Sequence, residues 1–177
     1  MRGYEWVDLG LPSGLKWATC NVGASNPGDY GNYYAWGETS TKSSYTEGNC
    51  STWDQNISDI AGTSRDAARR NWGGSWRMPR EAEIDELRNN CTWTWTTQIG
   101  NNGYKVTGPN GNSIFLPATG YCHGACSSLV GSWGKYWSST PYKSSTQEAY
   151  HLIFDSTRHY RGWDNRYYGK SVRPVLD

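Results

Sequence analysis

The sequence lacks an excess of charge of either sign, and this absence restricts its partners. It has 17 Lys and Arg residues against 16 Asp and Glu, a net charge of +1. Such a balance gives no electrostatic attraction to nucleic acid or to an anionic membrane. Runs of roughly 20 apolar residues, which cross a bilayer, are also absent. We therefore expect no nucleic-acid partner and no membrane insertion.

A signal peptide is missing as well. The first residues, MRGYEWVDLG, contain no apolar core of the kind that such peptides carry. We expect a mature or trimmed chain, or a protein that is not exported by that route.

Aliphatic residues and phenylalanine are scarce, whereas the larger aromatic residues are abundant. The hydrophobic share is 36%, with 2 Phe against 11 Trp and 13 Tyr. Rings with a polar tip suit half-exposed surfaces as well as cores. A chain of 177 residues with this many rings predicts one folded domain over residues 1–177, and argues against disorder.

Motifs for common catalytic and metal chemistry are absent. The three histidines fit no zinc-protease spacing, and no phosphate-binding loop occurs. Glu47, Asp54 and Asp59 lie in a long loop without the alternating oxygen ligands of a calcium loop, so solvated carboxylates are the favoured interpretation. We expect no cofactor; calcium stays an alternative that no motif supports.

The cysteine count is odd, which leaves the redox compartment open. Cys122 and Cys126 flank His123 in YCHGACSS, but no second Cys/His pair lies nearby. A loop disulfide or free thiols are therefore favoured over zinc.

The order of predicted elements indicates an α+β fold with short, mostly antiparallel strands and long loops. A short helix is predicted over 64–71 and a firmer one over 79–90, with Ile84, Leu87 and Cys91 on one face. After the second helix the period changes to two, and Asn110-Gly111 is typical of a hairpin turn. A long surface loop is predicted over 39–63. The predicted extended segments are 6–7, 15–19, 32–38, 92–99, 103–108, 113–120, 134–140, 148–154 and 166–176.

Five ordered segments carry a family resemblance that covers nearly the whole chain: WVDLGLPSGLKWATCNVGAS, YYAWGE, NWGGSWRMPREAEIDELRNNCTWTWTT, YWSSTPY and YYGKSVRPV. They resemble the major paralogous domain family of Bacteroidetes secreted proteins. That family is similar to the formylglycine-generating-enzyme branch of the C-type lectin fold. The resemblance implies a C-type-lectin-like fold with adjacent N- and C-terminal strands. It also implies a loop-bearing face built by the C-terminal third, about residues 134–175.

The chain departs from the enzymes of that branch, which hold copper with a cysteine pair before the final strand. Residues 140–169 contain no cysteine here, so the required thiolates are missing. The calcium-dependent lectins carry a Trp-Asn-Asp triplet, whereas this chain has Trp163-Asp164-Asn165 and no matching upstream triplet. We therefore expect a protein that is not an enzyme, and calcium-mediated glycan binding is a minority interpretation.

The segment from about residue 142 to 168 is the predicted ligand surface. Alternation in EAYHLIFD places Tyr150, Leu152 and Phe154 on a core face and leaves His151, Ile153 and Asp155 for the other. STRHYRGWDN, a predicted loop or irregular strand, adds the Tyr, Trp and Arg residues that dominate binding hot spots. The predicted contact residues are Tyr142, His151, Ile153, Asp155, Arg158, His159, Tyr160, Arg161, Trp163, Asp164, Asn165 and Tyr168.

Framework residues are predicted within the same region. Trp137 and residues 138–140 open a strand motif, and Arg173 is expected to be a buried structural arginine. Tyr167 is left ambiguous, because the closing strand could turn either tyrosine of its pair to solvent.

The resemblance extends to the variable proteins of diversity-generating retroelements, which keep YWSS and SVRPV and vary the residues between them. Their adenine-containing codons reach Tyr, Ser, His, Asp, Arg and Thr, the residue types found here at the exposed-face positions. This favours a hypervariable, receptor-binding or adhesin-like module for a protein or glycan ligand on a cell surface. The implied location is the cell surface, the secreted fraction or a bacteriophage virion. The alternatives are a formylglycine-generating-enzyme-like oxidoreductase and a structural tip domain of a surface or phage assembly.

Overall fold

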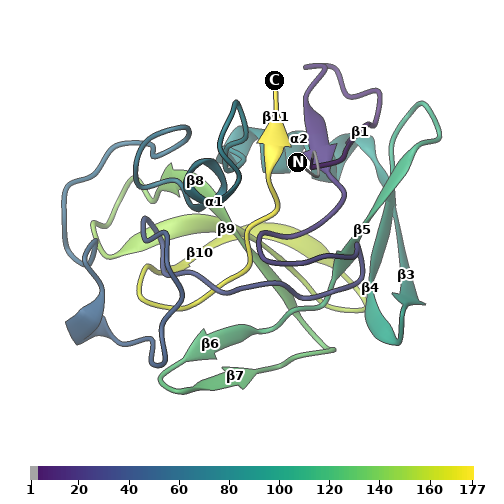
Figure 1. Cartoon of the computed structure of the whole chain (residues 1–177). Coiled ribbons are helices and arrows are strands. Elements are labelled where there is room, and N and C mark those ends of the chain that lie inside the picture. The colour runs from purple at the N-terminus through teal and green to yellow at the C-terminus, as the bar shows by residue number, and fades with distance from the viewer. Residues whose placement is uncertain (1–3) are drawn as a thin grey trace.

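The computed structural model describes residues 4–177, apart from the side chain of Cys126, as a mixed α+β fold with antiparallel sheets (Figure 1). This confirms the predicted α+β class. No helix in this part of the chain is long and apolar enough to cross a membrane.

The two ends of the chain meet in one small sheet of order β1-β2-β11. Its strands are β1 (Trp6–Asp8), β2 (Lys16–Ala18) and β11 (Val175–Leu176). Between β1 and β2 the chain turns at Gly14, whose φ of 75° favours glycine. Val175 lies opposite Trp17 in the register, so the last strand pairs directly with the second, as the resemblance implies.

The two helices begin and end close to their predicted bounds. α1 (Ala67–Trp72) is capped by Asp66, whose side chain accepts from Arg69 N. α2 (Glu81–Asn90) carries acidic residues in its first turn and buries Ile84 and Leu87. It begins two residues after Pro79, and Cys91 is the residue that ends it.

The period-two segment after α2 forms the predicted meander. β3 (Thr92–Gln98), β4 (Asn101–Thr107) and β5 (Ser113–Pro117) pair in sequence order. The turn between β4 and β5 contains Gly111 with φ 87°, which confirms a hairpin at Asn110-Gly111. The connection, residues 108–112, is longer than the two-residue turn that this pair predicts. A separate hairpin follows, made of β6 (Tyr121–His123) and β7 (Cys126–Ser128).

A third sheet, of order β10-β9-β8, carries most of the predicted contact residues. Its strands are β8 (Gly134–Pro141), β9 (Glu148–Phe154) and β10 (His159–Asn165). The segment after residue 155, predicted as a loop or irregular strand, contains a regular strand, because β10 pairs with β9 along its whole length. The predicted closing strand over 166–176 is also too long: only residues 175–176 form β11, while residues 169, 170 and 171 make isolated bridges.

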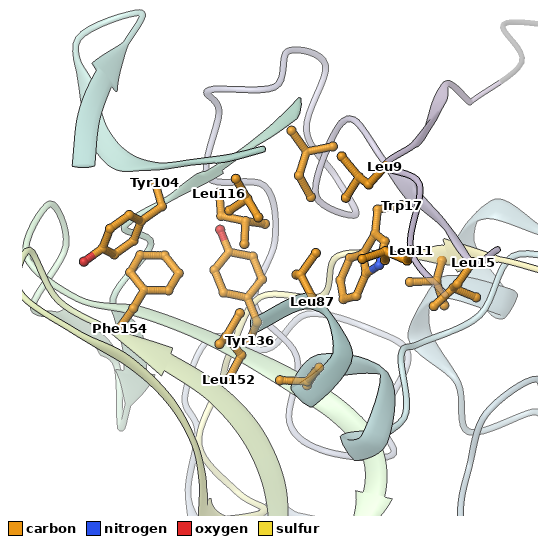
Figure 2. Packing of buried hydrophobic residues seen from close by; sticks show 14 of the residues in the cluster. Leu9, Leu11, Leu15, Trp17, Leu87, Tyr104, Leu116, Tyr136, Leu152 and Phe154 are labelled. Carbon is orange, nitrogen blue, oxygen red and sulfur yellow. The ribbon is translucent and has the colours of Figure 1, made fainter. Parts of the chain in front are cut away.

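The main core lies where the three sheets and α2 converge (Figure 2). Phe154 and Tyr104 pack edge to face with ring centroids 5.2 Å apart, and Tyr136 stacks on Phe154 at 5.9 Å. A second cluster around Trp36 and Trp137 lies beside it. The framework prediction for Trp137 is confirmed, since this ring is fully buried.

Arg173 is buried as predicted. Its guanidinium donates to Ala18 O at 3.0 Å, Phe115 O at 2.8 Å and Asn21 Oδ1 at 2.8 Å. It therefore ties three segments of the chain together.

The segment 39–63 is mostly irregular, as predicted, with one short 3-10 helix, η1 (Glu47–Asn49). It is more than a surface loop, because Tyr45 and Cys50 form a small buried cluster with Ala35. Ile60 is buried in the second core cluster.

Candidate binding face

The register of the β8–β10 sheet separates its side chains onto two faces. His151 lies opposite Gly162 and Trp137, and Ile153 lies opposite Tyr160 and Lys135. Directly paired residues point to the same side of a sheet. One face therefore carries His151 and Ile153, and the other carries the core residues of β9.

The expectation that His151 and Ile153 lie at the surface is wrong. His151 is 3% exposed and Ile153 is 7% exposed. The reason is that two further segments cover this face. Lys170 and Tyr34 exchange backbone hydrogen bonds of 2.9 and 3.0 Å. The indole of Trp137 donates to Tyr34 O at 2.8 Å.

A cluster of charged groups replaces the apolar contacts that a buried sheet face usually makes. Lys170 Nζ lies 2.7 Å from His151 Nδ1 and 2.7 Å from Asp164 Oδ2. Lys135 Nζ lies 3.6 Å from the same Asp164 oxygen. The ammonium of Lys170 also lies 4.1 Å from the ring centroid of Trp137. We call these four residues, His151, Asp164, Lys135 and Lys170, the lysine cluster.

Burial sets the proton affinities within the lysine cluster. It lowers the pKa of Lys170 to about 7, although the nearby Asp164 carboxylate acts in the opposite direction. Burial, followed by the charges of Lys170 and Lys135, also holds the pKa of His151 well below its ordinary value. For Asp164, burial acts to raise the pKa, but the charge and hydrogen bond of Lys170 keep it below the ordinary value. A protonated Lys170 donates to Nδ1, so the neutral His151 carries its proton on Nε2.

Aromatic side chains form the outer rim of this cluster. Lys135 Nζ lies 4.1 Å from the ring centroid of Tyr121, and Tyr121 meets Tyr168 edge to face at 5.4 Å. Tyr168 in turn contacts His123 at 5.0 Å and Tyr167 at 4.7 Å. All of these residues are partly or fully exposed.

Tyr160 extends the rim along β10. It lies in the same row of the sheet as Lys135, and the Arg158 guanidinium lies 5.3 Å from its ring centroid. We define the tyrosine face as Tyr121, His123, Lys135, Arg158, Tyr160, Tyr167 and Tyr168.

The tyrosine face is assembled from separate parts of the chain. Cys122 and Gly169 exchange backbone hydrogen bonds of 2.7 and 2.9 Å, which hold β6 beside the segment that follows β10. Figure 1 shows the β6–β7 hairpin running along the edge below that segment. The tyrosines of both segments are therefore held by backbone pairing.

The side chains of three predicted contact residues extend from the opposite face of β10. His159 stacks on Trp93 with centroids 4.2 Å apart, and Arg161 forms ion pairs with Glu81 and Asp85 of α2. Trp163 is 52% exposed and stacks on Tyr142, with centroids 4.7 Å apart and ring planes 2° from parallel. The predicted residues therefore do not form one continuous surface.

The remaining predicted residues lie at the two ends of β10. Asp155 accepts from Thr157 N at 2.8 Å and Arg158 N at 3.1 Å, so it stabilises the β9–β10 turn. Arg158 is exposed at that turn, and Asn165 is partly buried at the other end. Asp155 and its hydrogen bonds hold Arg158 beside Tyr160.

Sequence reasoning missed part of this face. Tyr121 and His123 lie before the predicted binding region of about residues 134–175, and Lys135 lies within it but before the predicted ligand surface of 142–168. No local pattern in the sequence places these three residues beside Tyr168. The doubled tyrosine at 167–168 was the available signal, and both of its rings prove to be partly exposed.

Among the described side chains, no group of three or more His, Cys, Asp and Glu residues is arranged to hold a metal ion. Cys20, Cys50 and Cys91 are free cysteines. The predicted alternatives for Cys122 and Cys126, a loop disulfide or free thiols, concern the Cys126 side chain, which lies outside the described part of the structure.

Comparison with known families gives one match. No curated protein and no solved structure matches the chain. A family model described as Domain of unknown function (DUF8237) matches residues 84–175, which is more than half of the 177-residue sequence. The matched region runs from α2 to β11 and contains Lys135, Asp164, Lys170 and every residue of the tyrosine face. The chain therefore belongs to the DUF8237 family.

Proposed function

We propose that this protein is a non-catalytic binding module that recognises a protein or glycan on a cell surface through the tyrosine face. The observation that carries the proposal is the continuous series of ring contacts from Tyr121 through Tyr168 to Tyr167, with Lys135 over Tyr121. Tyr160, with Arg158 over its ring, extends the face along β10. Tyr and Arg provide rigid contact area and forked hydrogen bonds, and both dominate binding hot spots.

Preorganisation supports binding at this face. The Tyr167–Tyr168 pair lies between β10 and the backbone hydrogen bonds of Gly169 and Lys170. Lys170 Nζ also donates to Asp164 Oδ2 at 2.7 Å, which fixes the Asp164 side chain. A surface whose side chains are already ordered loses little conformational entropy on binding.

A C-type-lectin-like fold of the formylglycine-generating-enzyme subtype is part of the proposal. It rests on the five sequence segments named above, and it is consistent with the pairing of β11 with β2, which joins the chain ends.

Diversification by a retroelement is a further part of the proposal, and the burial of individual residues makes it specific. Arg158, Tyr160 and Tyr168 are open enough to vary without a large loss of stability. His151 and Asp164 belong to the lysine cluster, and substituting either would leave a buried Lys170 without one of its partners. Natural copies of the gene are therefore expected to differ at the first three positions and to keep the last two.

A binding screen with matched variants tests the function. The purified protein is applied to an immobilised glycan array and to a panel of intact bacterial cells, alongside Tyr168→Ser and Tyr4→Ser. Tyr4 is also an exposed tyrosine, but it stacks on Trp72 in a different part of the fold. We expect specific binding that Tyr168→Ser lowers about tenfold or more and Tyr4→Ser leaves unchanged.

Two results would contradict the proposal. Equal loss in both variants would place the interaction elsewhere. Self-association that buries Trp163, in place of ligand binding, would favour the structural tip domain.

A further inference from the structure

A groove with a volume of about 680 Å³ lies apart from the tyrosine face, between residues 54–58 and 141–147, with Arg166 in its lining. We call it the Arg166 groove. Its two walls are joined directly, because Thr146 Oγ1 donates to Asp54 Oδ1 at 2.6 Å. The Arg166 backbone N–H also donates to Gln147 O at 2.9 Å. The groove is therefore formed before any ligand arrives.

Arg166 is 1% exposed, yet its hydrogen bonding is incomplete. Nε donates to Glu148 O at 3.1 Å, and Nη1 donates to Thr52 O at 3.0 Å and to Gln55 O at 2.7 Å. A guanidinium has five N–H donors, so the two on Nη2 are left over. Nη2 has no partner among the described residues.

Within residues 4–177, Arg166 also has no ion-pair partner, although the Asp54 carboxylate acts on its charge from farther away. Its hydrogen-bond acceptors are backbone carbonyl oxygens, and no carboxylate of the described chain lies within ion-pair distance of the guanidinium. The guanidinium instead lies over Trp36, 4.4 Å from the ring centroid. Nη2 is not among the side-chain atoms that are sealed from solvent without a partner, so it is accessible where Arg166 lines the groove. A bound carboxylate would accept from both of its N–H groups and pair with the charge.

The rest of the groove offers side chains that can form hydrogen bonds with the hydroxyl groups of a ligand. Asn56, Ser58 and Ser144 line it, and their side chains make no hydrogen bonds within the described part of the chain. Tyr142 contributes an aromatic ring, which Trp163 holds in place from one side. Free amide and hydroxyl groups beside an aromatic ring match the alternating polar and apolar surfaces of a sugar.

We propose that the Arg166 groove binds a saccharide unit that carries a carboxylate. The carboxylate pairs with Arg166 Nη2, the sugar hydroxyls bond to Asn56, Ser58 and Ser144, and the sugar ring lies against Tyr142. Lys143 adds a second positive charge to the lining, against the single carboxylate of Asp54. This binding site is separate from the tyrosine face and does not depend on the function proposed for it.

The test is a titration with sugars that differ only at the acidic group. D-glucuronic acid and D-glucose share their ring and differ in a carboxylate, acetate supplies the carboxylate alone, and N-acetylneuraminic acid is a second acidic sugar. Binding is followed by the NMR shifts of the Arg166 Nε–H group and of the amides of residues 142–147. We expect at least one acidic sugar to shift these signals and to bind about tenfold or more tightly than D-glucose or acetate.

Variants separate the groove from other surfaces. Asn56→Trp fills the groove from an exposed position and should abolish the shifts, whereas Asn89→Trp, on the exposed side of α2, should keep them. Arg166→Lys should lower the affinity about tenfold or more, since lysine lacks the two N–H donors that Nη2 offers to a carboxylate. Tyr168→Ser should keep the affinity, which distinguishes this site from the tyrosine face.

Three results would overturn the proposal. They are equal affinity for D-glucose and the acidic sugars, equal affinity for acetate, and no shift with either acidic sugar.

Discussion

Replacing Lys170 with methionine should change how stability depends on pH. Lys170 is fully buried between His151 and Asp164, and burial lowers its pKa from 10.5 to about 7. The folded protein therefore releases this proton near pH 7, whereas the unfolded chain keeps it until about pH 10.5. Above pH 7 the unfolded state binds more protons, so the free energy of unfolding rises with pH.

The size of this effect follows from the two pKa values. One proton of difference between the states changes the free energy of unfolding by about 1.4 kcal/mol per pH unit. Half of the folded molecules are already deprotonated at pH 7, which reduces the slope there. Between pH 7 and pH 8.5 the contribution of Lys170 is therefore roughly 1.5 kcal/mol.

Urea unfolding followed by tryptophan fluorescence measures this slope. The wild type, Lys170→Met and a control, Lys105→Met, which removes an exposed lysine, are compared at pH 7.0, 7.5, 8.0 and 8.5. We expect the wild type and Lys105→Met to gain stability in parallel, and Lys170→Met to gain roughly 1.5 kcal/mol less over the range. Parallel profiles for all three proteins would refute the reasoning, because they would show that Lys170 keeps its proton when the protein folds.

Further predictions concern the framework that holds the two sites, and urea unfolding checks each. Phe154→Ala should cost about 3–5 kcal/mol, since this ring is fully buried at the junction of the core; a cost below about 1 kcal/mol would contradict the core assignment. Gly134→Ala should destabilise severely because its Cβ would lie 2.0 Å from Phe154 Cζ, whereas the nearest atoms to a Cβ at Gly162, in the same sheet, are His151 Nε2 at 3.0 Å and Cδ2 at 3.3 Å; equal effects would argue against this register. Asp66→Ala should cost at least about 2 kcal/mol, because the buried carboxylate accepts from Gly62 N, Arg69 N and Met78 N. Asp66→Asn should recover part of that loss.

The parts of the fold that the sequence predicted well are those set by local patterns. α2 and the β3–β5 meander follow from residue spacing alone, since each has one apolar face against the core. The β4–β5 turn follows from the conformational freedom of Gly111.

The regularity of β10, which was predicted as a loop or irregular strand, was missed because the segment is polar on both faces. Arg161 meets the acidic residues of α2, while Asp164 on the other side meets Lys170 and Lys135. Neither face is apolar, so the segment shows no strand period. Its regularity comes from pairing with β9, which is a tertiary effect.

The candidate site was predicted only in part, because tertiary contacts also decide which of its side chains are exposed. The ligand surface was predicted over about residues 142–168, and Tyr160 and Tyr168 from this segment lie on the tyrosine face. His151 was expected outside because it is polar, but Lys170, from a distant part of the sequence, covers it. Tyr121 and Lys135 join the face through sheet register and the Cys122–Gly169 bridge, which local composition does not reveal.

Hydrogen–deuterium exchange of the protein, free and bound to the ligand that the screen identifies, is the decisive test of binding at the tyrosine face. We expect new protection in two separate segments, residues 121–123 and 158–168, with no change in the β3–β5 sheet. Protection confined to the β3–β5 sheet, or to the surface around Tyr4 and Trp72, would contradict it.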